Sequence, residues 1–72
     1  MGSDGLSAAG WTIGDRVIIN AKNRNSHGWR GTVDGFIEEV PGITRIVVEF
    51  EDRAGRRMSM TFGPTELVVS RV

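Results

Sequence analysis

The 72-residue chain contains no cysteine and no tyrosine, and it has only one histidine and two prolines. The absence of cysteine excludes a disulfide and a thiolate zinc site. Without these side chains, general acid–base chemistry would depend on carboxylates or on a single imidazole. No apolar run approaches the roughly 18 residues of a membrane span, and no signal peptide is visible at the start. We therefore expect a non-enzymatic cytoplasmic protein that holds no metal ion or cofactor and contacts no membrane.

The composition describes one small domain with little surplus stability. Nine Lys and Arg balance nine Asp and Glu, and 39% of the residues are hydrophobic. A chain of this length buries only about 60% of its unfolded surface on folding, so its backbone must be well hydrogen-bonded. Residues 1–10 are rich in Gly, Ser and Ala and lack periodicity, which predicts a flexible tail. The folded domain is expected to span residues 11–72.

Short runs of alternating apolar residues predict strands, whereas no long segment has helical periodicity. The expected strands are Arg16–Ile19, Trp29–Val40, Arg45–Phe50, Arg57–Phe62 and Leu67–Val72. Between the first two, Ala21–Gly28 has no apolar period and is expected to form a long exposed loop. The alternation also assigns Met58 and Met60 to the core.

Glycine and proline mark the bends between and within these strands. Gly31 and Gly35 interrupt the second strand, where they favour a bulge or the close approach of another backbone. Pro41-Gly42 is typical of a tight turn, and Glu51–Gly55 of a hairpin loop. Gly63–Leu67 suits a single 3-10 turn. Because an open five-stranded sheet would expose both edges, we expect an all-β, five-stranded barrel with this turn before its last strand.

This layout is that of the SH3-like barrel, and particular residues extend the resemblance. Gly14–Ile19 followed by a loop and Gly28–Val33 resembles the KOW motif of ribosomal proteins and transcription elongation factors. This resemblance implies a nucleic-acid or ribonucleoprotein partner.

Two further SH3-like families provide alternatives. Over residues 14–69 the chain is similar to the photosystem I accessory subunit and related electron-transfer accessory barrels, which implies docking to proteins within a larger complex. The shared features are Gly14, Val17, Ile19, Gly31–Val33, Val48–Phe50, Phe62 and Glu66-Leu67.

The opening Gly14–Val17 also resembles the plasmid-borne type II dihydrofolate reductase, an oligomeric enzyme. The Val-Gln-Ile-Tyr run of that family is replaced here by Met58–Thr61, so its cofactor and folate contacts do not carry over.

Charge is unevenly distributed along the neutral chain. Residues 16–30 carry four Lys or Arg and no acid, residues 31–52 carry six acids and one Arg, and residues 53–57 carry three Arg. The first basic group is combined with Asn and Trp side chains, a mixture suited to phosphate contacts and base stacking. The same charges could instead form a solvated loop or a protein-docking surface, and homo-oligomerisation stays open.

The predicted contact residues therefore lie in the loop between residues 20 and 30. They are Lys22, Arg24, Asn25, His27, Trp29 and Arg30. A secondary basic patch would consist of Arg53, Arg56 and Arg57. Val47 and Ile18 point outward from their strands and would contribute to a protein contact. No catalytic or metal-ligating residue is assigned.

Overall fold

The computed structural model describes residues 7–51 and 54–70, and in this part of the chain it is all-β, as the sequence predicted. The elements are β1 (Ser7–Ala8), β2 (Trp11–Thr12), β3 (Arg16–Ile19), β4 (Arg30–Val40), β5 (Ile43–Glu51), β6 (Arg57–Phe62), the 3-10 helix η2 (Pro64–Glu66) and β7 (Leu67–Val69). Within the described ranges, no helix has the length and apolar character needed to span a bilayer.

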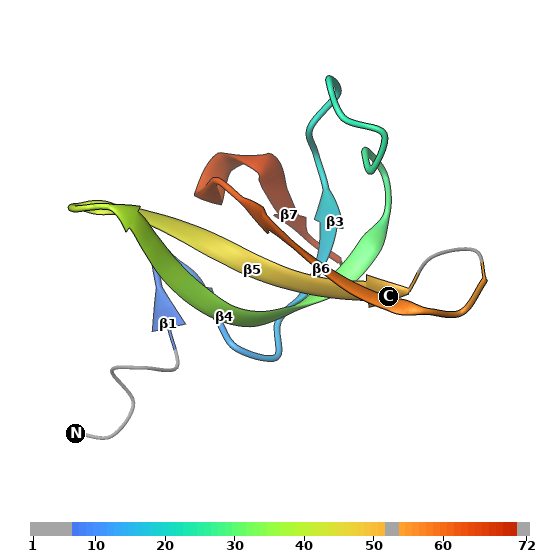
Figure 1. The fold of residues 1–72 in the computed structure, drawn as a ribbon, viewed down its shortest axis with the longest axis horizontal. Coiled ribbons are helices and arrows are strands. Elements are labelled where there is room, and N and C mark those ends of the chain that lie inside the picture. Colours follow the sequence, from blue (N-terminus) through green and yellow to red (C-terminus); the bar gives the residue numbers. More distant parts are fainter. Residues whose placement is uncertain (1–6, 52–53, 71–72) are drawn as a thin grey trace.

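The principal sheet has five antiparallel strands in the order β6-β5-β4-β3-β7 (Figure 1). β7 has only three residues, and all of them pair with β3. Among the described strands, β6 and β7 do not pair with each other, so the sheet keeps two open edges. The closed barrel expected from the sequence is therefore not detected, although the five strands and the 3-10 turn before the last one are confirmed.

The strand predictions agree closely with the observed elements. β3 has the predicted bounds, β4 begins one residue later than expected, and β5 begins two residues earlier. The predicted Pro41-Gly42 turn is present; of the predicted loop Glu51–Gly55, Glu51 belongs to β5 and residues 52–53 lie outside the described residues. Gly42 and Gly55 adopt φ values of 86° and 82°, which an L side chain rarely tolerates. Of the predicted last strand, Leu67–Val69 is confirmed, Ser70 lies beyond the end of the strand, and residues 71–72 lie outside the described part of the chain.

β4 bends along its length because its pairing with β5 is interrupted twice (Figure 1). The register shifts lie between Val33 and Gly35 and between Glu38 and Val40. At Gly31 the strand lies so close to β5 that an added Cβ would be 2.6 Å from Val48 Cγ1. The two glycines that the sequence singled out in this strand thus have different roles. Gly31 allows the close approach of β5, and Gly35 lies at the first register shift.

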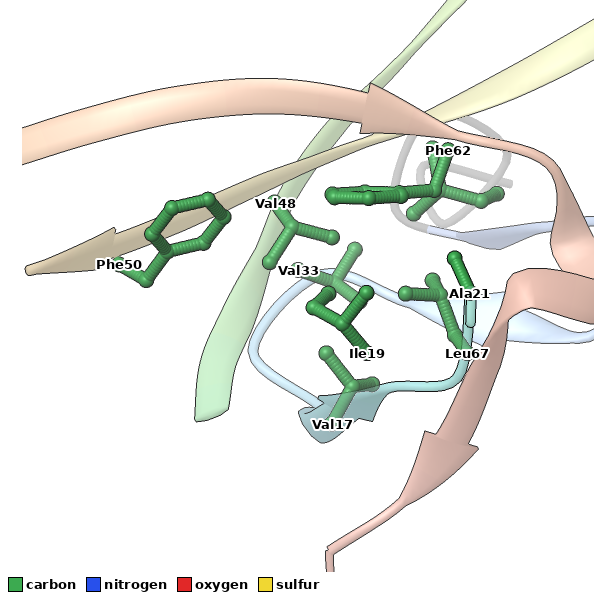
Figure 2. Packing of buried hydrophobic residues seen from close by; sticks show 9 residues of the cluster. Val17, Ile19, Ala21, Val33, Val48, Phe50, Phe62 and Leu67 are labelled. Atoms are coloured by element: carbon green, nitrogen blue, oxygen red, sulfur yellow. The ribbon is translucent and has the colours of Figure 1, made fainter. Parts of the chain in front are cut away.

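The core is a single cluster of aliphatic side chains closed by two phenylalanines (Figure 2). Its buried members are Val17, Ile19, Ala21, Val33, Ile46, Val48, Phe50, Phe62 and Leu67. Trp11 packs against this cluster, and its indole N–H donates to the Pro64 carbonyl at 3.2 Å. β3, β4, β5, β6 and β7 all contribute to the cluster, so one core holds the sheet in its bent form.

The segment before the domain is partly structured. Ser7–Ala8 pairs with Trp11–Thr12 across a turn in which Ala9 and Gly10 have φ values of 55° and 88°. These four positions, 7–10, were assigned to the flexible tail on composition alone. Positive φ and paired strands at 7–12 give a hairpin there, whereas residues 1–6 lie outside the described residues.

Candidate binding site

The loop between β3 and β4 folds back on its own ends and stands out from the sheet (Figure 1). The Ile19 amide donates to the Trp29 carbonyl and the Gly28 amide to the Ile19 carbonyl, both at 2.8 Å. Gly28 has φ 87°, which lets the chain reverse before Trp29. The Asn20 amide donates to the Glu66 carbonyl at 2.6 Å and so fixes the loop to η2. These bonds give the loop a defined shape.

Two loop residues differ from the sequence prediction of a fully exposed segment. Ala21 joins the core, and Ser26 is only 2% exposed. The Ala21 amide donates to Nδ1 of the exposed His27 at 3.1 Å, so this hydrogen bond links the two ends of the 21–27 segment. The small side chains Ala21 and Ser26 fill the interior of the folded-back loop, whereas the exposed residues of the segment are Lys22, Asn23, Asn25 and His27.

Arg24 is held in place by two contacts. Its Nε lies 3.8 Å from Oε2 of Glu66, and its Cζ lies 5.1 Å from the centroid of the Phe62 ring. The other carboxylate oxygen of Glu66 accepts the Gly63 amide at 2.8 Å. Since both charged side chains are about one-third exposed, the ion pair contributes less than about 1 kcal/mol to stability. Its main effect is to orient the guanidinium over the apolar ring.

A groove of about 490 Å³ lies between this loop and β6. Its lining consists of Arg24, Asn25, Ser26, Trp29, Met58 and Met60, and most of that lining is apolar. Three of these residues, Arg24, Asn25 and Trp29, were predicted from the sequence as contact residues. We refer to these six residues as the groove.

Trp29 is the central aromatic side chain of the groove and is half-buried. Its ring packs edge-to-face on Phe50, with centroids 5.1 Å apart and an interplanar angle of 80°. This geometry holds the indole against the core while part of it borders the groove. The Ser26 hydroxyl is buried and has no hydrogen-bond partner among the described residues. The groove is therefore a mainly apolar surface in which Trp29 is positioned by its contact with Phe50.

The remaining predicted contact residues lie elsewhere. Lys22 and His27 are exposed on the loop but do not border the groove. Arg30 lies on β4 and borders two pockets on the outer face of the sheet, opposite the core. The structure therefore does not bring Arg30 to the groove that Trp29 borders.

Within the described residues, the basic residues of 16–30 and of 53–57 come together at one place only, the pocket that Arg30 and Arg57 share. Arg30 and Arg57 border one outer pocket, but Glu49 and Glu51 border it as well. Arg56 is exposed, and Arg53 lies outside the described residues. The expected secondary patch is thus a surface of mixed charge at Arg57.

The sequence interpretation missed Met58 as a surface residue. Its side chain is 37% exposed, although the alternation of β6 assigned it to the core with Met60 and Phe62. β6 extends beyond the core at its first residues, so Met58 faces the loop instead. The signal that could have indicated its exposure is its position beside a polar hairpin loop. An apolar residue near the end of a strand lies at the edge of a small core and is often only partly covered.

Across residues 7–51 and 54–70, no three His, Asp or Glu side chains lie close enough together to hold a metal ion. Comparison with protein-family models, with curated proteins and with solved structures finds no match to this chain.

Proposed function

We propose that this protein is a non-enzymatic, SH3-like binding module, and that the groove receives an apolar side chain from a segment of a partner protein. The strand order β6-β5-β4-β3-β7 and the 3-10 helix before β7 support the SH3-like assignment. The groove supports the docking role, because a rigid aromatic ring and two flexible methionines form an apolar surface that adapts to a partner side chain.

One observation favours a protein over a nucleic acid. In the part of the chain that the structure describes, Arg24 is the only charged side chain bordering the groove, and it is already within 3.8 Å of Glu66. Phosphate backbones are bound mainly through several Lys and Arg side chains that are free to neutralise them. An apolar groove with one partly neutralised cation is better matched to an apolar anchor residue.

Selection from a phage-displayed peptide library, followed by titration of the enriched peptides, tests the docking role. We expect the peptides to share an apolar residue and to shift the amide resonances of Asn25, Ser26 and Met60. Met58→Ser should weaken binding about tenfold, roughly 1–2 kcal/mol. Ile37→Ser is the matched control, because Ile37 is 40% exposed on β4 and does not border the groove. Equal effects of the two variants would disprove the assignment of the groove.

A nucleic-acid or ribonucleoprotein partner is the second candidate, favoured by Trp29, Asn25 and Arg24 in one groove with Lys22 exposed on the same loop. With two cations near the groove, the affinity for a uridine decamer should fall with a log–log salt slope of only about −1.4. Arg24→Gln should weaken that binding, whereas Arg57→Gln should not. Peptide binding that depends on Met58 without oligonucleotide binding would remove this candidate.

A further inference from the structure

One of the two pockets on the outer face of the sheet differs from the groove in its lining residues. This outer-face pocket has a volume of about 260 Å³ and is bordered by Arg16, Val17, Arg30, Gly31, Thr32 and Ser70. Among residues 7–51 and 54–70, no acidic side chain borders it, and it offers two guanidinium groups and two hydroxyl groups. We propose that it binds a dianionic phosphate group, either free phosphate or the phosphate of a small phosphomonoester.

The pairing of β3 with β4 brings the two arginines together. Arg16 pairs with Thr32 and Ile18 pairs with Arg30, so the two arginines are diagonal neighbours on one face. Diagonal neighbours on paired strands are roughly 7–8 Å apart, a distance that two long side chains can span to contact one anion. The register of the strands therefore creates the pair, although 13 residues separate them in the sequence.

Both guanidinium groups are available for a ligand. Arg16 and Arg30 are exposed, and neither forms an ion pair or side-chain hydrogen bond with any other described residue. Two like charges on neighbouring positions repel each other, and a shared dianion removes this repulsion. Arginine presents paired N–H donors that match the oxygens of a phosphate.

Hydroxyl groups border the same pocket. Thr32 lies directly opposite Arg16 on the neighbouring strand. The Ser70 amide donates to the Arg16 carbonyl at 2.9 Å, which holds Ser70 beside this arginine. Each hydroxyl can donate one further hydrogen bond to a phosphate oxygen. Two cations and two neutral donors are a donor set for a tetrahedral dianion.

Two acidic residues of this face lie on the β5 side of the pocket. Glu49 pairs with Thr32 from β5, and Glu49 and Glu51 border the mixed-charge pocket that also contains Arg57. They oppose binding of an extended polyanion across the sheet, because its next charges would meet carboxylates. The charge pattern thus favours a compact phosphate over a nucleic-acid backbone.

The test is an NMR titration of the 72-residue chain with potassium phosphate, with glycerol phosphate and with a thymidine decamer that lacks a terminal phosphate. Phosphate and glycerol phosphate should shift the amide resonances of Gly31, Thr32 and Ser70 and reach saturation. Arg16→Gln and Arg30→Gln should each weaken the binding about tenfold. Arg57→Gln is the matched control and should bind as the wild type does.

The charge of the ligand provides an independent check. Because the second pKa of a phosphomonoester is about 6, binding at pH 5 should be several times weaker than at pH 7.5. Shifts that do not saturate, or arginine variants that bind as tightly as Arg57→Gln, would overturn the proposal. Binding of the decamer at the same residues as tightly as glycerol phosphate would overturn it in favour of a nucleic-acid backbone. Met58→Ser should leave phosphate binding unchanged, so the outcome is independent of the groove.

Discussion

Replacing Gly31 with alanine tests how closely β4 approaches β5. The added methyl group would lie 2.6 Å from Val48 Cγ1, 2.8 Å from the Glu49 carbonyl oxygen and 3.3 Å from Phe50 Cβ. A side chain can rotate away, but the carbonyl oxygen belongs to a paired strand and can move only with it. Such overpacking costs about 1–3 kcal/mol, and the lower entropy of the unfolded alanine chain offsets about 0.4–1 kcal/mol. We expect a net loss of about 1–2 kcal/mol.

Gly35→Ala is the matched control for this substitution. It lies on the same strand, has no positive φ, and would place its methyl group in open space. It should be neutral or stabilise the protein by up to about 1 kcal/mol. Urea denaturation of both variants measures the difference, and each kcal/mol should change the melting temperature by about 4–8 °C in a domain of this size. Equal stabilities would refute the close approach of β4 to β5 at Gly31.

Three further substitutions test the core and the loop. Ile46→Ala removes a fully buried side chain and should cost about 2–5 kcal/mol in denaturant unfolding, whereas a loss below 1 kcal/mol would contradict its central position. Ser26→Ala removes a buried hydroxyl that has no partner among the described residues, so stability should stay unchanged or rise by about 1 kcal/mol, and a clear loss would mean that the hydroxyl is bonded. Arg24→Gln should cost less than about 1 kcal/mol, since its ion pair is partly exposed, and calorimetry of the variant would reveal a larger role.

The strands could be predicted because their signals are local. In β5, Ile46, Val48 and Phe50 alternate with polar or partly exposed residues, and all three are buried. The 3-10 helix η2 follows from Pro64 at its first position, and the turn at Gly42 from a residue that tolerates positive φ. Each of these features depends on a few neighbouring residues, so no long-range information is needed.

Closure of the sheet could not be predicted in the same way. The sequence argument was that open edges are unfavourable, but this is a general tendency and does not specify which strands pair. The observed sheet keeps β6 and β7 as edges while one core packs against all five strands. Burial of the apolar face thus comes from the bending of β4, whose pairing with β5 shifts between Val33 and Gly35 and between Glu38 and Val40, and it does not require the last two strands to meet.

The candidate site was predictable only in part, because its members come from segments that are distant in sequence. Arg24 and Trp29 share one loop, and the groove they border also needs Met58 from β6. Grouping Arg30 with Trp29 overlooked the alternation of strands: β4 begins at Arg30, whose side chain lies on the outer face. Its neighbour there is Arg16.

The register of the β3–β4 pair decides which charged residues act together. A long loop connects these strands, so its length does not fix their pairing, unlike a two-residue hairpin turn. A shift of β3 by one residue would move Arg16 to the core face and separate it from Arg30. The buried positions Val17 and Ile19 forbid that shift, because they would move to solvent. The hydrophobic pattern of four residues in β3 therefore determines the core and also the pairing of the two arginines on the opposite face.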